Sequence, residues 1–196
     1  MSIRRLDYDF FHRDTAQVAQ DLIGKLFIYH SDMGDIGGRI VETEAYLGKN
    51  DPACHSAKGM TKSNAQMFGT CARSYIYHNY GIHLCYNVTT DTDDIPAAVL
   101  LRAIEPIYGI QEMIGRRQKA NGELMRLCNG PGNLTRAMAL PMSLNGQTVL
   151  DGESIGFYDD GFCPQNIATS GRIGISAGKD MQLRYLLAGS PFLSRK

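Results

Sequence analysis

The stretch Arg39-Ile-Val-Glu-Thr-Glu-Ala-Tyr46 decides how the chain folds. Its residues alternate in character, which predicts an extended strand in which every second side chain shares a face. One face is then expected to carry Ile40, Glu42, Glu44 and Tyr46, and the other Val41, Thr43 and Ala45. Two carboxylates and a phenol on an apolar strand fit either a surface strand with both acids in solvent or a catalytic carboxylate beside an aromatic wall.

Short helices and strands surround this strand without regular β-α-β alternation. Apolar spacing predicts helices over residues 15–23, over residues 107–118 with Pro106 in the first turn, and from Pro131 onward. Strands are expected at residues 25–30, 39–46, 74–80, 84–89 and 97–104, and near 154–158, 172–176 and 183–188, with a turn at residues 35–38. The pattern predicts an α+β fold: one mixed domain over residues 1–196, with a curved, largely antiparallel sheet, flanking helices and a protruding β-hairpin.

Composition is that of a globular protein. Hydrophobic residues make up 43% and charged residues 20% of the 196 residues. No apolar run is long enough to span a membrane and the first residues lack a secretory signal, so we expect a cytoplasmic protein. The five cysteines are widely spaced and form no C-x-x-C pair, which favours reduced thiols and argues against a structural zinc site. We therefore expect no metal and no cofactor.

Charge is balanced overall but unevenly distributed. Lys and Arg number 20, as do Asp and Glu, yet residues 52–90 contain no acid while Lys58, Lys62 and Arg73 are present. This stretch is either a modest nucleic-acid footprint or an ordinary solvated surface. The acids resume at Asp91-Thr-Asp-Asp94, whose turn-like composition favours a solvated loop over a metal site.

Aromatic residues gather in Ser74-Tyr-Ile-Tyr-His-Asn-Tyr-Gly-Ile-His-Leu-Cys-Tyr-Asn87, the pattern of a hairpin that turns at Gly81. Tyr80 and Ile82 fall at its turn. Large apolar groups at a hairpin tip either pack back onto the protein or serve as a wedge between DNA base steps, as in enzymes that extrude a base.

Several motifs, in order and over nearly the whole chain, resemble those of the alkyladenine (3-methyladenine) DNA glycosylase family. They include Arg39-Ile-Val-Glu-Thr-Glu-Ala-Tyr-Leu-Gly48, Asp51-Pro-Ala-Cys-His-Ser56, Asn64-Ala-Gln-Met-Phe-Gly69, Ala97-Ala-Val-Leu-Leu-Arg-Ala-Ile-Glu-Pro106, Leu127-Cys-Asn-Gly-Pro-Gly132 and Gly189-Ser-Pro-Phe-Leu-Ser-Arg195. The resemblance implies a base-excision-repair enzyme that flips alkylated purines, of the 3-methyladenine and 7-methylguanine type, out of duplex DNA and removes them by hydrolysis. It also implies a monomer, without a membrane partner, that acts on the bacterial nucleoid or, in a eukaryote, in the nucleus.

The resemblance assigns the chemistry to two residues. Glu44 would be the base that activates water, and Arg102 would help to hold that water and the carboxylate; the alternative for Arg102 is a structural ion pair. Glu42 is expected to be structural. A purine methylated at N3 or N7 is cationic and leaves without a proton, so one carboxylate suffices. The matched motifs offer no lysine nucleophile, which implies a monofunctional enzyme that leaves an abasic site.

The resemblance also assigns the base pocket and the wedge. Tyr46 would form one wall and His55 with Tyr77 the other, around a cationic base that gains stacking and cation–π attraction. The alternatives are that His55 is an ordinary loop histidine and that Tyr77 is a core residue. Asn87 would disfavour the amino group of normal guanine, or would only bond to backbone at a strand end. Tyr80, with Ile82 beside it, would intercalate into DNA.

Two rival functions remain at this level. The first is a non-catalytic protein that binds damaged nucleic acid, and the second is a small-molecule nucleosidase, which would need no wedge. The chain also departs from the family: Met60, Ser63 and Asn133 stand where relatives commonly carry basic residues, so contacts to DNA phosphates are expected to be fewer. Gly130-Pro-Gly132 could offer backbone N–H groups to a phosphate or simply start a helix.

Overall fold

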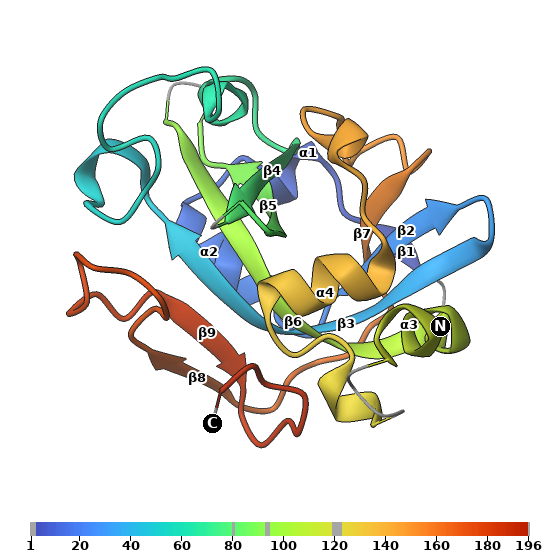
Figure 1. The fold of residues 1–196 in the computed structure, drawn as a ribbon. Helices are drawn as coiled ribbons and strands as arrows, with labels where there is room; N and C mark the ends of the chain where they lie inside the picture. Colours follow the sequence, from blue (N-terminus) through green and yellow to red (C-terminus); the bar gives the residue numbers. More distant parts are fainter. Residues whose placement is uncertain (1–2, 80, 93–94, 119–122, 196) are drawn as a thin grey trace.

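A computed structural model describes residues 3–79, 81–92, 95–118 and 123–195. All the described strands belong to one sheet, and every pairing in it is antiparallel (Figure 1). The order along the sheet is β1 (Arg4–Arg5), β7 (Ile155–Asp159), β2 (Leu26–Ser31), β3 (Gly34–Tyr46), β6 (Ala97–Tyr108), β5 (His83–Thr90) and β4 (Ser74–Asn79). The pair β8 (Ile167–Ser170) and β9 (Arg184–Leu187) joins at β3.

The described residues include four short α-helices beside this sheet. They are α1 (Tyr8–Phe11), α2 (Thr15–Asp21), α3 (Ile110–Arg116) and α4 (Pro131–Met138). Short 3-10 helices occur at Gly48–Asn50, Ala65–Phe68, Leu124–Arg126 and Met142–Leu144. The α+β class and the antiparallel sheet are confirmed. Among the described residues no helix is long and apolar enough to cross a membrane.

The main core lies between the sheet and the helices. The Phe27 ring lies 4.7 Å from that of Tyr86 and 5.0 Å from that of Phe157, so β2, β5 and β7 meet in one aromatic cluster. The Thr43 hydroxyl donates a buried hydrogen bond to the Ala19 carbonyl and ties α2 to β3. This leaves the opposite face of β3 for the candidate site.

The turn expected at residues 35–38 is wrong, because these residues lie inside β3. Their glycines serve close approach of neighbouring strands. A Cβ at Gly37 would lie 2.1 Å from the Phe27 carbonyl oxygen, and one at Gly38 would lie 1.9 Å from that of Glu105. Glycines in a sequence commonly indicate a turn. Here they lie within a strand, because the neighbouring strands approach too closely for a larger side chain.

Two further expectations are corrected around Pro106 and near the C-terminus. Strand β6 runs through Pro106 to Tyr108, and the helix begins at Ile110 after Gly109, which has φ +65°. The residues expected to form a strand at 172–176 form none, and the strand in this region is Ile167–Ser170. The remaining expected helices and strands are present, with ends shifted by a few residues.

The alternation along β3 is also interrupted. The pairing of β3 with β6 is irregular between Ile40 and Glu42. Ile40 therefore joins the main core together with Ala45, whereas Val41 packs with Ala103 and Phe192 in a separate cluster. Ile40 does not share a face with Glu42, contrary to the simple alternation expected from sequence, because an irregularity in the ladder shifts the facing of the side chains.

Candidate active site

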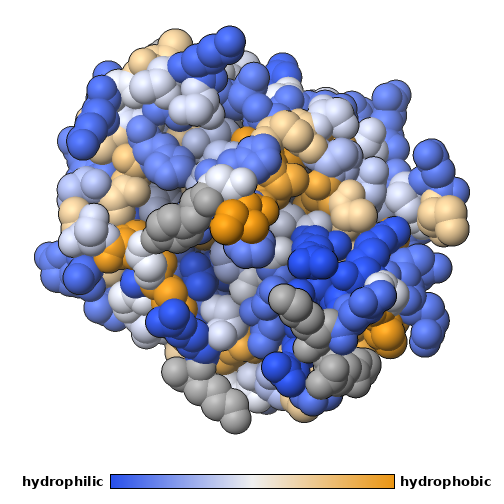
Figure 2. Space-filling model, in the orientation of Figure 1, coloured by the Kyte–Doolittle hydropathy of each residue, from blue (hydrophilic) through white to orange (hydrophobic). Residues whose placement is uncertain are grey.

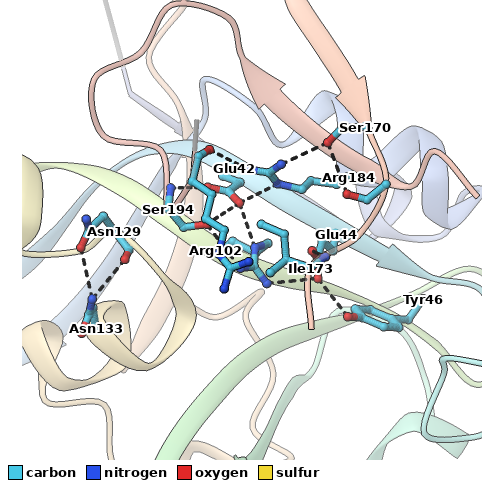
Figure 3. A network of polar contacts seen from close by, with 12 residues as sticks. Glu42, Glu44, Tyr46, Arg102, Asn129, Asn133, Ser170, Ile173, Arg184 and Ser194 are labelled. Atoms are coloured by element: carbon cyan, nitrogen blue, oxygen red, sulfur yellow. Dashed lines mark hydrogen bonds and ion pairs between the residues drawn. The ribbon is translucent and has the colours of Figure 1, made fainter. Parts of the chain in front are cut away.

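Glu44 is fully buried in β3 and has three hydrogen-bonding or charged neighbours (Figure 3). Its Oε2 accepts a 2.9 Å hydrogen bond from the Tyr46 hydroxyl and lies 3.3 Å from Nη1 of Arg102. Its Oε1 accepts a 2.7 Å hydrogen bond from the backbone N–H of Ile173. A carboxylate offers about four acceptor positions. Three are occupied, which leaves about one for a water proton.

Arg102 connects this carboxylate to a second one. Its Nε donates to Glu42 Oε1 at 2.8 Å while its Nη1 faces Glu44. Arg184 Nε donates to the same Glu42 oxygen at 2.8 Å. Ser194 adds bonds from its backbone N–H at 2.6 Å and its hydroxyl at 2.7 Å. The side chain of Arg102 is thus held from behind by Glu42 while its other end faces Glu44 (Figure 3).

The charge of Glu42 is well compensated. Burial alone would raise the pKa of Glu42, but the hydrogen bonds from Ser194 and the charges of Arg102 and Arg184 outweigh it and lower the pKa. Burial likewise opposes the charge of Arg102, and the two carboxylates together raise its pKa. Arg102 therefore does form the buried ion pair that was its structural alternative, and it contacts Glu44 as well.

A pocket of about 280 Å³ opens beside this cluster, and its lining includes Tyr46, His55, Tyr77, Asn87, Arg102 and Pro131. The segment 173–176 closes another side. Small-ligand sites start at about 300 Å³, so this volume suits a single ring system better than a whole nucleotide. Every residue expected to form the base pocket lies in this one cavity, and Glu44 lies behind Tyr46 and Arg102.

Another part of the pocket lining is built from rings. His55 and Tyr77 meet edge to face, with their centroids 4.4 Å apart. His55 Nδ1 lies 2.9 Å from the Tyr75 hydroxyl, and the Asn64 side chain donates to the His55 carbonyl at 2.9 Å. Burial raises the pKa of both tyrosines and lowers the pKa of His55. All three rings are therefore held in their neutral forms near pH 7.

Tyr46 is held at one face of its ring as well as through its hydroxyl. The Arg172 guanidinium lies over its ring, 4.7 Å from the centroid. Arg172 also forms a fully buried ion pair with Asp51 and donates to the Ala45 carbonyl at 3.0 Å. Burial would raise the pKa of Asp51, but the bonds from Arg172 and from the Ala53 and Leu47 N–H groups lower it. This pair fixes one wall of the pocket.

Asn87 forms the backbone hydrogen bond that was one of its two expected alternatives, and it also lines the pocket. Its side-chain amide donates a 3.0 Å hydrogen bond to the Tyr75 carbonyl, and the same residue lines the pocket. The backbone bond fixes how the amide is presented to whatever occupies the cavity.

The hairpin β4–β5 ends beside this pocket. Ile82 lies at its turn and is 77% exposed, and its N–H donates to the Asn79 carbonyl. The other expected wedge residue, Tyr80, lies outside the described residues. Ile82 therefore does not pack back onto the protein, which was the alternative to a DNA wedge at this hairpin tip.

Sequence reasoning missed four side chains of the cluster: Asp51, Arg172, Arg184 and Ser194. Asp51 and Ser194 stand in quoted motifs, so a signal was present without a role. Arg172 and Arg184 lay in or near short C-terminal strands that carried no chemical signal, and only the pairing of β9 with β3 brings Arg184 to Glu42.

No group of three or more metal-ligating side chains occurs among the described residues. Cys54, Cys71, Cys85 and Cys128 are buried and Cys163 is exposed, all as free thiols. Asp91 accepts a hydrogen bond from the Thr15 hydroxyl at 3.1 Å, while Asp93 and Asp94 lie outside the described residues.

A buried carboxylate behind a ring-walled pocket, beside an exposed hairpin tip, is an arrangement suited to removing one base from DNA, and it belongs to the class of DNA glycosylases. The profile described as Methylpurine-DNA glycosylase (MPG) matches residues 9–191, and the chain belongs to this family. It is a DNA N-glycosylase for alkylated bases, which places it in base-excision repair.

Relatives from several organisms agree with this assignment. A protein of Methanoculleus marisnigri named "Putative 3-methyladenine DNA glycosylase" is 42% identical over 190 residues, which cover 95% of this chain and 97% of the relative. Proteins with the same name from Koribacter versatilis and Chlorobaculum tepidum are 41% and 42% identical, over 95% and 98% of this chain and 91% and 92% of theirs.

Proposed function

We propose that this glycosylase is monofunctional and hydrolytic, with Glu44 as the general base. The observation that carries the proposal is the one remaining acceptor position on a buried carboxylate whose three other contacts come from Tyr46, Ile173 and Arg102. A water held there would lose its proton to Glu44 as it attacks the sugar carbon. The same negative charge would stabilise the oxocarbenium-like transition state.

In this scheme Arg102 orients the general base Glu44 and the attacking water. The hydrogen bond to Glu42 fixes the Arg102 side chain. Its Nη1 therefore faces Glu44 before the reaction begins and does not have to move during it. A group that is already in place adds no reorganisation cost to the chemical step.

The pocket selects cationic purines. A 3-methyladenine or 7-methylguanine base would lie between Tyr46 and the pair His55–Tyr77, whose neutral rings favour a positive charge by about 1–2 kcal/mol per good contact. Asn87 would discriminate against the exocyclic amino group of normal guanine. A cationic base leaves without protonation, which fits a site with one ionisable carboxylate in reach.

The reaction leaves an abasic site rather than a cut strand. No lysine lines the pocket in the described part of the chain, so the cavity itself supplies no amine to form an imine with the sugar. The base would be flipped from duplex DNA by a monomer, with Ile82 and Tyr80 filling the vacated slot.

The test is release of free methylated base from alkylated duplex DNA by wild-type and Glu44→Gln protein. General-base catalysis contributes about 10²–10⁴-fold. We therefore expect the variant to bind lesion DNA but to release base at least 100-fold more slowly. Unchanged release would remove Glu44 from its role, and no release by the wild type would favour the non-catalytic binder.

Two further measurements test the finer points. Trapping a covalent protein–DNA adduct with borohydride would contradict the monofunctional mechanism. Tyr80→Ala is expected to weaken base release from duplex DNA, whereas intact activity after this change would favour a nucleosidase that acts on small molecules.

A further inference from the structure

A second hollow, separate from the base pocket, lies between α3 and α4. Its volume is about 210 Å³, and its lining consists of Gly115, Arg116, Arg117, Gln118 and Arg136. Three arginines thus line a space large enough for a phosphate group. In Figure 2, strongly hydrophilic side chains gather over α3 and α4 on the face that also presents the β4–β5 hairpin in Figure 1.

The positive charge in this hollow is not neutralised by the protein. Arg116 donates to the Ala137 carbonyl at 3.1 Å, and Arg117 donates to the Leu127 and Arg126 carbonyls at 3.1 and 3.2 Å. These acceptors carry no net charge. Among the described residues, no carboxylate forms a salt bridge with any of the three lining arginines; the nearby Glu123 pairs with Arg126 instead.

The arginines also repel one another. The pKa of Arg117 is lowered, first by burial and then by the charges of Arg136 and Arg126. Such crowding costs free energy that a bound anion would recover, because a doubly or triply held phosphate forms strong charge-assisted hydrogen bonds. Arg117 uses two of its five N–H donors on carbonyls, so donors remain available.

Helix capping accounts for part of this cluster only. Arg116 and Arg117 hold α3 against the end of α4 and the preceding loop through carbonyl oxygens. Arg136 is exposed and makes no such bond within the described structure, so packing does not explain its placement at the hollow.

Helix α4 links the hollow to the base pocket. Pro131, its first residue, lines the pocket, and Arg136 follows five residues later. At 1.5 Å per residue this corresponds to about 7.5 Å along the helix axis. Successive phosphates of one strand advance by about 3.4 Å along a duplex. Along α4 the hollow is therefore only a few phosphate spacings from the base pocket, although five residues turn the helix by about 140°, so that Arg136 and Pro131 project from different sides of α4.

We propose that this arginine-lined hollow binds a backbone phosphate of the DNA strand that carries the flipped base. The contact offsets the basic residues missing at Met60, Ser63 and Asn133, and it lets a chain of zero net charge hold DNA. This proposal rests on the action of the chain on DNA and is independent of the role of Glu44.

The test compares Arg136→Gln with Arg4→Gln, which removes an exposed arginine from the edge strand β1. Dissociation constants are measured over a range of salt concentrations on lesion-bearing and undamaged duplexes. Each lost phosphate contact lowers the slope of log Kd against log salt by about 0.9. We expect this decrease for Arg136→Gln, together with a several-fold higher Kd on both duplexes and an unchanged single-turnover rate at saturating enzyme. Arg136→Lys should recover most of the slope.

Three outcomes would overturn the proposal. The first is an unchanged slope in Arg136→Gln, and the second is an equal decrease in Arg4→Gln, which would indicate overall charge rather than a site. The third concerns a free ion: inorganic phosphate shifts the arginine Nε–H NMR signals of the wild type, while the DNA slope is unaffected by Arg136→Gln. In that case the hollow holds phosphate ions and not the DNA backbone.

Discussion

The Tyr46 hydroxyl donates a 2.9 Å hydrogen bond to Glu44 Oε2, so a wall of the base pocket and the buried carboxylate form one unit. Burial and the adjacent Glu44 raise the pKa of Tyr46, which keeps this hydroxyl a donor. The Arg172 guanidinium holds one face of the ring. A base that stacks on Tyr46 is therefore placed at a fixed distance from the group that would activate water.

Tyr46→Phe tests this coupling. The ring and its stacking remain, but Glu44 loses one of its three contacts and becomes less well oriented. A hydrogen bond to a charged group contributes about 1.5–3 kcal/mol, so we expect a single-turnover rate lowered by about 10–100-fold at saturating enzyme. Lesion affinity should change little. Tyr77→Phe, on the other wall, is the matched control and should keep most of the rate; an equal loss in both variants would contradict the coupling.

Glu42→Gln separates structure from chemistry within the same cluster. Removing this charge leaves Arg102 and Arg184 buried with less compensation, and loss of one partner of a buried pair costs about 3–5 kcal/mol. We expect a clear loss of unfolding free energy in urea denaturation, with a smaller loss of rate than in Glu44→Gln. A stable Glu42→Gln protein with a rate as low as that of Glu44→Gln would reverse the two assignments.

The sequence predicted which side chains line one cavity better than it predicted the connections that support them. Period-two alternation placed Glu44 beside Tyr46, and the hairpin pattern placed Ile82 at an exposed tip. Gly37 and Gly38 led to the wrong prediction of a turn at residues 35–38, because glycine occurs both in turns and where neighbouring strands approach closely. The contacts of Glu42 with Arg184 and Ser194 span more than 140 residues, and local periodicity carries no information on such pairs.

His55 predicts how activity depends on pH. Burial lowers its pKa below the ordinary value of 6.5, so the imidazole is neutral at pH 7 and becomes protonated as the pH falls through that lowered pKa. An imidazolium in the pocket wall would repel a cationic base. We expect binding of 7-methylguanine DNA to weaken on the acid side, as the pH falls through the lowered pKa of His55. His55→Gln should reduce this acid-side loss, while His78→Gln, at an exposed position on strand β4, should retain it. An identical profile in all three proteins would exclude His55 as the cause.

The charge of the lesion provides the last prediction. Hypoxanthine is neutral and needs a proton on the leaving base, and the pocket lining offers no carboxylic acid in the described part of the chain. The cationic 7-methylguanine needs no such proton and also gains attraction to the neutral rings of Tyr46, His55 and Tyr77. We therefore expect a single-turnover rate at saturating enzyme that is at least 10-fold higher for 7-methylguanine than for hypoxanthine, with both bases placed in the same duplex. Equal rates would mean that a protonating group reaches the base, and the assignment of Glu44 as the only carboxylate needed would then be wrong.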